Sequence, residues 1–77
     1  MSRTFTDEEL QSWEAFASSG DFGFAEQPKI VFNPLSDPGG RARYVEIHGD
    51  EADAEELLSE VDEHRLRELL RESVPLE

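Results

Sequence analysis

Large apolar side chains fall in clusters along this chain, and turn-forming residues separate the clusters. The first cluster recurs at the spacing of one helix face: Leu10, Trp13, Phe16 and Ala17. Thr6 and Glu9 fit a capping box ahead of it, and Gly20 fits the left-handed residue that ends many helices. The pattern predicts an N-terminal helix over about residues 7–18.

The middle of the chain alternates with the period of β-strands. In residues 29–33, Ile30 and Phe32 share one face and Val31 lies on the other. In residues 42–48, one face carries Arg43, Val45 and Ile47, and the other carries Tyr44, Glu46 and His48. A Pro- and Gly-rich turn over residues 35–40 separates these segments, so they predict an antiparallel hairpin with a wide loop. Residues 22–25 are a candidate for an additional edge strand.

The last third of the chain has the composition of helix. Ala54, Leu57, Leu58 and Val61 form one apolar face, and Leu66, Leu69 and Leu70 form another. These faces lie roughly 130° apart at 100° per residue, so one straight helix cannot bury both. The chain therefore predicts helices over residues 51–61 and 63–73, with Asp62 capping the second and Pro75 following its end.

Together these elements predict one α+β domain over residues 1–77. It has an N-terminal helix, a small antiparallel sheet of two or three strands, and two C-terminal helices packed on one sheet face. Residues 75–77 are expected to be a tail, and Leu76-Glu77 fits the remnant of an expression tag. The expected core is Trp13, Phe16, Ile30, Phe32, Val45, Ile47, Leu57, Leu58, Leu66, Leu69 and Leu70.

The charge balance restricts the function. The chain has 19 Asp and Glu, 7 Lys and Arg, a formal net charge of −12, and no cysteine. Such a charge disfavours direct contact with nucleic acid or an anionic membrane. With no secretory signal and no long apolar run, we expect a soluble cytoplasmic protein. Abundant carboxylates with a single lysine are typical of proteins from a salt-rich cytosol, or of a GC-rich genome that replaces Lys by Arg.

The turn between the two predicted strands is a candidate anion site. Gly39 and Gly40 can expose backbone N–H groups, and Arg41 and Arg43 supply guanidinium groups nearby. The segment matches neither a P-loop nor a dinucleotide fingerprint. The alternative is an ordinary hairpin loop whose arginines offset nearby acids.

A candidate partner-binding surface is formed by aromatic and polar residues of the β-rich region: Phe22, Phe24, Tyr44 and His48. An exposed Phe22 and Phe24 would form an apolar patch of the kind that marks a binding surface. The alternative is that these aromatic rings belong to the core.

Nine of the 18 residues from Glu46 to Glu63 are acidic, and none is basic. This segment fits a surface for a basic partner, a mimic of nucleic-acid phosphates, or a solvated helix face. The spacing around Asp50 does not match an EF-hand, and no pair of histidines has metal-ligand spacing. We therefore expect no metal and no cofactor.

No nucleophile motif or enclosed acid–base pair is evident, so we do not expect an enzyme. The sequence favours a non-catalytic protein–protein interaction module that binds an unknown protein, basic in charge, or a second copy of the chain. Two alternatives stay open. One is a small-molecule or anion-binding domain at the loop from Asp37 to Arg43, and the other is an acidic mimic that inhibits a nucleic-acid-binding protein.

Overall fold

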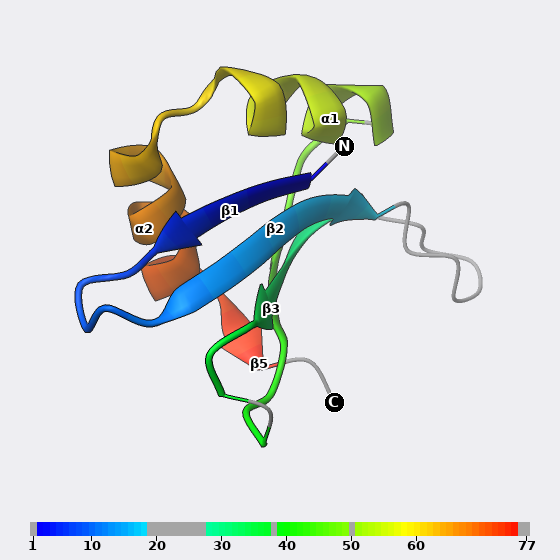
Figure 1. The fold of residues 1–77 in the computed structure, drawn as a ribbon. Helices are drawn as coiled ribbons and strands as arrows, with labels where there is room; N and C mark the ends of the chain where they lie inside the picture. The colour runs from blue at the N-terminus through cyan, green and yellow to red at the C-terminus, as the bar shows by residue number, and fades with distance from the viewer. Residues whose placement is uncertain (1, 19–27, 38, 50, 76–77) are drawn as a thin grey trace.

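The computed structural model describes residues 2–18, 28–37, 39–49 and 51–75. In these ranges the chain forms one antiparallel sheet of five strands and two helices (Figure 1). In chain order the elements are β1 (Ser2–Thr6), β2 (Ser12–Ser18), β3 (Lys29–Pro34), β4 (Arg43–Glu46), α1 (Glu51–Glu60), α2 (Glu63–Glu72) and β5 (Val74–Pro75). The spatial order of the strands follows the chain, and β5 returns after both helices to pair with β4.

The predicted N-terminal helix is wrong, because residues 2–18 form the hairpin of β1 and β2. The predicted sheet of two or three strands is also too small. In β2 the burial alternates, so Trp13 and Ala15 face the core while Glu14 and Phe16 face the other way. The helical spacing of Leu10, Trp13 and Phe16 is therefore coincidental, because Trp13 and Phe16 lie on opposite faces of the sheet.

The turn between β1 and β2 is held by a side-chain cap of the kind found at helix starts, but the acceptor is Asp7 and not the Thr6 of the predicted capping box. The Asp7 carboxylate accepts hydrogen bonds from the backbone N–H groups of Glu9 and Gln11, at 2.8 and 2.9 Å. Leu10 donates its N–H to the Asp7 carbonyl at 3.1 Å, and then adopts a positive φ of 66°. The left-handed conformation of Leu10 ends the helix-like geometry after a single turn, and the chain then reverses direction into β2.

The predicted hairpin of the two central strands is confirmed. β3 pairs antiparallel with β4, and Ile30 lies opposite Val45 while Phe32 lies opposite Arg43. β4 is shorter than predicted, since it ends at Glu46. The candidate edge strand at residues 22–25 lies outside the described residues.

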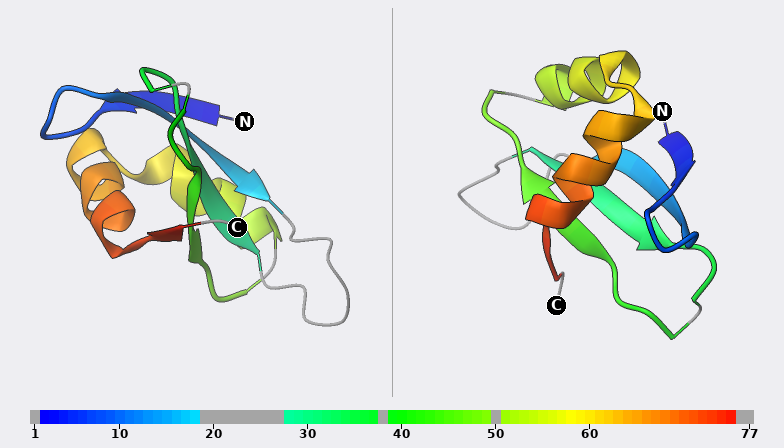
Figure 2. Two further views of the ribbon diagram at one scale, coloured as in Figure 1. Left: turned by 90° about the horizontal axis from the view of Figure 1, so that it is seen from below. Right: turned by 90° about the vertical axis from the view of Figure 1, so that its left-hand side faces the viewer.

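The two C-terminal helices and the break between them are confirmed. Asp62 caps α2 by accepting a hydrogen bond from the Arg65 backbone N–H at 2.9 Å. Both helices lie on the same side of the sheet (Figure 2). The buried core joins them to β1, β2 and β3 through Phe5, Trp13, Ala15, Ile30, Phe32, Ala54, Leu58, Leu66 and Leu69. Phe5, Ala15 and Ala54 were not among the expected core residues. Five expected core residues are only partly buried: Phe16, Val45, Ile47, Leu57 and Leu70.

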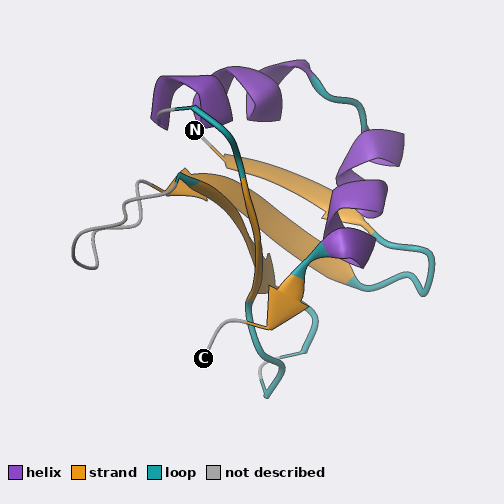
Figure 3. Ribbon diagram, turned by 180° about the vertical axis from the view of Figure 1, so that it is seen from behind, coloured by secondary structure: helices purple, strands orange, loops and turns teal. Residues whose placement is uncertain are grey.

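Two arginines on the helix-facing side of the sheet hold the C-terminal ends of the two helices. Arg3 of β1 donates to the carbonyl oxygens of Leu58 and Val61 at the end of α1. Arg43 of β4 donates to the hydroxyl and carbonyl oxygens of Ser73, which follows α2, at 2.9 and 2.6 Å. Unpaired carbonyls make a helix C-terminus partially negative, so each guanidinium both satisfies hydrogen bonds and offsets that charge. Figure 3 shows how closely the end of α2 approaches the sheet through β5.

Candidate functional site

A groove of about 520 Å³ lies between the β1–β2 turn and α2. Its lining comes from the turn, from β2 and β4, and from α2: Asp7, Glu8, Glu9, Trp13, Arg43, Arg67, Leu70 and Arg71. Three carboxylates and three guanidinium groups cancel to a formal charge of zero in this lining. In a chain of net charge −12 the groove is therefore much less repulsive to an anion than the average surface.

The turn side of the groove is fixed by Asp7. Besides the two backbone N–H groups of the turn, its carboxylate accepts the indole N–H of Trp13 at 2.8 Å. Burial alone would raise the pKa of Asp7, but the hydrogen bonds from Gln11, Trp13 and Glu9 and the charge of Arg67 together hold this pKa below its usual value. Asp7 is thus an ionised acceptor that orients the turn and the single tryptophan of the chain.

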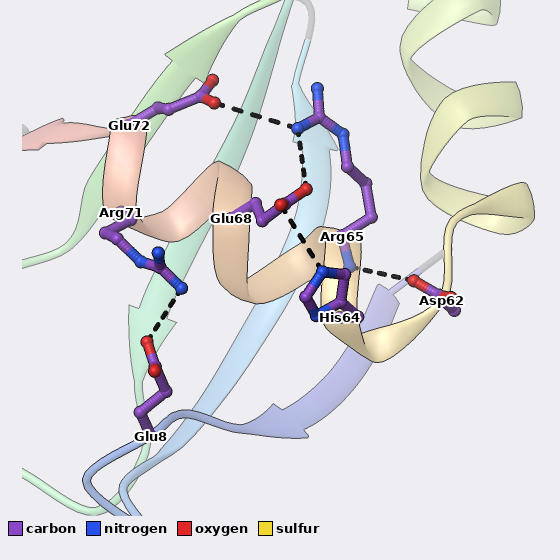
Figure 4. A network of polar contacts seen from close by, with 7 residues as sticks. All are labelled: Glu8, Asp62, His64, Arg65, Glu68, Arg71 and Glu72. Atoms are coloured by element: carbon purple, nitrogen blue, oxygen red, sulfur yellow. Dashed lines mark hydrogen bonds and ion pairs between the residues drawn. The ribbon is translucent and has the colours of Figure 1, made fainter.

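The helix side of the groove is fixed by arginines. Arg67 donates through Nε to the Thr6 carbonyl at 2.7 Å and pairs with Glu63 at 2.9 Å. Arg71 pairs with Glu8 at 2.9 Å and so joins α2 to the β1–β2 turn (Figure 4). Both side chains of the Arg71–Glu8 pair are well exposed, at 64% and 70%, so this pair adds little stability.

A chain of ionisable side chains lies on the solvent side of α2. Glu68 lies between His64 and Arg65, at 3.5 and 3.3 Å, and Arg65 reaches Glu72 at 3.8 Å (Figure 4). These contacts connect residues one or two turns apart on the exposed side of α2. Their role is local helix support.

The sheet face turned away from the helices carries an apolar row. Strand pairing places four side chains side by side across β2, β3, β4 and β5, which we call the outer row: Phe16, Val31, Tyr44 and Val74. Val31 is buried, Phe16 and Tyr44 are half-buried, and Val74 is 48% exposed. The neighbouring rows are polar: Glu14 and Asn33 lie on one side, and Lys29 and Glu46 lie on the other.

The glycines and arginines of the predicted anion site do not converge on one point in the structure. Gly39 donates its N–H to the Asp37 carboxylate at 3.2 Å, and Gly40 donates its own to the Asp37 carbonyl at 2.9 Å. Arg41 is exposed, whereas Arg43 turns to Ser73 and lines the groove. Asp37 thus accepts both glycine N–H groups that were expected to meet a ligand. Anion binding at this loop stays a prediction.

Of the four predicted partner-binding residues, the structure describes Tyr44 and His48, and it places them in different surroundings. Tyr44 belongs to the outer row, and the Lys29 ammonium lies 5.8 Å from the centre of its ring. His48 is exposed beyond the end of β4. Phe22 and Phe24 lie outside the described residues.

The acidic segment follows β4 into α1. Asp53, Glu56 and Glu60 recur at one-turn spacing and share a side of this helix, while Glu55 lies on another side. Phosphate mimicry by these carboxylates stays a prediction. Within the ranges 2–18, 28–37, 39–49 and 51–75, no group of three His, Asp or Glu side chains is placed to hold a metal ion.

Neither the outer row nor the groove was predicted from the sequence. Assigning residues 7–18 to a helix put Trp13 and Phe16 on one face, whereas in β2 they lie on opposite faces of the sheet. The alternation from Ser12 to Ser18 was the signal that could have found the strand. The groove brings together the turn at residues 7–9 and α2, which are more than fifty residues apart, so no local pattern could reveal it.

Comparisons with protein-family models, with curated proteins and with solved structures found no match. Among the residues that the structure describes, no helix has the length and apolar character needed to cross a bilayer.

Proposed function

We propose that this chain is a non-catalytic interaction module that binds a basic partner protein through the outer face of its sheet. The observation that carries the proposal is the outer row of Phe16, Val31, Tyr44 and Val74. Val31 is buried, while Phe16, Tyr44 and Val74 of this row keep exposed apolar surface that a partner can cover. A row of this kind with polar residues on both sides has the layout of a small protein interface.

The charges beside the row favour a basic partner. Glu14 and Glu46 lie in the polar rows that flank it, and Lys29 is the one basic side chain there among the described residues. The whole chain carries −12, so a basic partner is attracted over a long range while a second copy of this chain is repelled. Charge complementarity therefore selects a basic protein over self-association.

The carboxylate of Asp7 is suited to binding and structure more than to acid catalysis. The pKa of Asp7 is held below its usual value. A general acid at neutral pH needs a raised pKa. A carboxylate that three donors hold ionised is suited to a structural role.

The test uses a short peptide of alternating Lys and Val and a matched peptide of alternating Glu and Val. Backbone amide shifts of the labelled protein are recorded during each titration. We expect the basic peptide to shift residues of the outer row and its flanks, because its Val side chains meet the row while its Lys side chains meet Glu14 and Glu46. The acidic peptide should cause no localised shift.

Two variants make the result specific. Phe16→Glu places a charge in the row and should abolish binding, whereas Leu35→Asp changes an apolar side chain outside the row that is 48% exposed and should not. Equal binding of the two peptides would contradict the proposal. A dimer seen by sedimentation at low salt and lost in Phe16→Glu would instead identify the partner as a second copy.

A further inference from the structure

The groove between the β1–β2 turn and α2 lies on the helix side of the sheet, away from the outer row. We propose that it is a separate binding site for a small organic acid, with a carboxylate held by arginine and an apolar body against Trp13 and Leu70. The site is independent of the proposed protein-binding face. Its volume of about 520 Å³ falls within the range of roughly 300–1,000 Å³ typical of small-molecule sites.

The arginines of the groove are held in place before any ligand arrives. Arg43 is fixed by two hydrogen bonds to Ser73, a neutral residue that is 4% exposed. Arg67 is fixed by the Thr6 carbonyl and by Glu63. Each guanidinium has five N–H donors, so these contacts leave further donors for a ligand. Side chains that are already ordered lose little entropy on binding, which favours recognition of a planar carboxylate.

Arg43 has no anionic partner among its described contacts. Both of its hydrogen-bond partners belong to uncharged Ser73, whereas Arg67 and Arg71 each pair with a glutamate. The partial negative charge at the end of α2 offsets the charge of Arg43 only in part. A carboxylate in the groove would give this guanidinium the anionic partner that its described contacts lack.

The apolar part of the lining selects an organic anion over an inorganic one. Trp13 and Leu70 contribute apolar surface to the lining. Inorganic phosphate would leave that surface in contact with water, whereas a branched aliphatic acid would cover it. The ligand class is therefore a carboxylic acid with a compact apolar body.

The test measures binding of 4-methylpentanoate, its primary amide, acetate and inorganic phosphate. Two readouts are used: fluorescence of Trp13, which is the single tryptophan of the chain and lines the groove, and backbone amide shifts of the turn and α2. We expect the acid to bind about fivefold more tightly than the amide, equivalent to roughly 1 kcal/mol from the charge. Acetate and phosphate should bind more weakly than 4-methylpentanoate because they lack the apolar body.

Two variants of the exposed ion pair should change the affinity in opposite directions. Arg71→Gln removes a cation from the groove and should weaken binding about two- to fivefold. Glu8→Gln breaks the same pair but frees Arg71 and removes a negative charge, so it should strengthen binding. Arg65→Gln, on the same helix but outside the lining, should leave the affinity unchanged.

These side chains are exposed, so the variants should keep the fold, which amide spectra would verify. Three outcomes would each overturn the proposal. They are equal affinity for the acid and the amide, phosphate binding as tight as that of 4-methylpentanoate, and the same direction of change in Arg71→Gln and Glu8→Gln. Amide shifts confined to the outer row would mean that the acid binds on the other face of the sheet, and this result would also contradict the proposal.

Discussion

Asp7 connects three parts of the molecule through one side chain. One carboxylate oxygen accepts two backbone N–H groups of the turn, and the other accepts the indole N–H of Trp13. These acceptor roles favour the ionised form, because protonation would remove the negative charge and one acceptor lone pair from this set of hydrogen bonds. Asp7 therefore couples the shape of the β1–β2 turn to the position of a core aromatic ring.

We predict that Asp7→Asn destabilises the protein by about 1–2 kcal/mol, because the amide group turns a donor toward the Trp13 indole or toward the turn. The folded state lowers the pKa of Asp7 below its usual 3.8. Its contribution to stability is therefore fully present above pH 3.8 and is lost as the pH falls through the lower folded-state pKa. Denaturant titrations between neutral and acid pH, followed by Trp13 fluorescence, measure both effects.

Glu9→Gln is the matched control, since Glu9 contributes only its backbone N–H to the hydrogen bonds described for this turn. It should leave the stability and the acid transition nearly unchanged. If Asp7→Asn retained the same acid-dependent change in Trp13 fluorescence as the wild type, another group would be responsible for it.

The conformation of Leu10 explains why the β1–β2 turn was not predicted from the sequence. It has a φ of 66° and its side chain is 84% exposed. Glycine is the usual residue in this conformation, because a side chain there costs roughly 1–2 kcal/mol. A glycine would have marked the end of the turn in the sequence, whereas a leucine at helical spacing from Trp13 extended the apparent helix.

At the scale of elements, signals contained within one segment were reliable. The two differently directed apolar faces and the capping residue Asp62 correctly predicted the break between α1 and α2. The alternation of Ile30, Val31 and Phe32 correctly predicted β3. Elements defined by distant partners were not predictable. β5 has only two residues and exists because Tyr44 of β4 pairs with Val74 after both helices have been completed. The short β1 likewise depends on pairing with β2.

The contact of Arg3 with α1 also joins residues that are far apart in the chain, and it leads to a testable prediction. Arg3→Gln removes the guanidinium that binds the carbonyls of Leu58 and Val61. We expect a loss of about 1–3 kcal/mol, the usual range for a part-buried hydrogen bond to a charged group. Urea unfolding measures the total loss, and hydrogen exchange of α1 amides should show that this helix is affected most.

Arg65→Gln is the control for this prediction, because Arg65 makes its ion pairs on the exposed side of α2. Its cost should stay below about 0.5 kcal/mol. Equal losses in the two variants would mean that Arg3 acts only through overall charge. A loss spread evenly over all amides would argue against a local role at the end of α1.

At the scale of the whole molecule, the ion pairs described on α2 leave most of the negative charge unbalanced. The chain has 19 acidic and 7 basic residues, and both arginines that hold helix ends are bound to neutral oxygen atoms. Repulsion among the remaining carboxylates is relieved on unfolding, since the expanded chain separates them. The fold should therefore gain stability whenever this repulsion is screened.

We predict that raising KCl from about 0.1 M to about 1 M, which shortens the Debye length from about 10 to 3 Å, raises the melting temperature at pH 7. A gain of about 1 kcal/mol would appear as an increase of about 4–8 °C in a domain of this size. The matched control is the same scan near pH 4.3, the isoelectric point, where the net charge and the salt effect should both vanish. A melting temperature independent of KCl at pH 7 would favour a GC-rich genome as the origin of the composition, because adaptation to a salt-rich cytosol requires the stabilisation that salt provides.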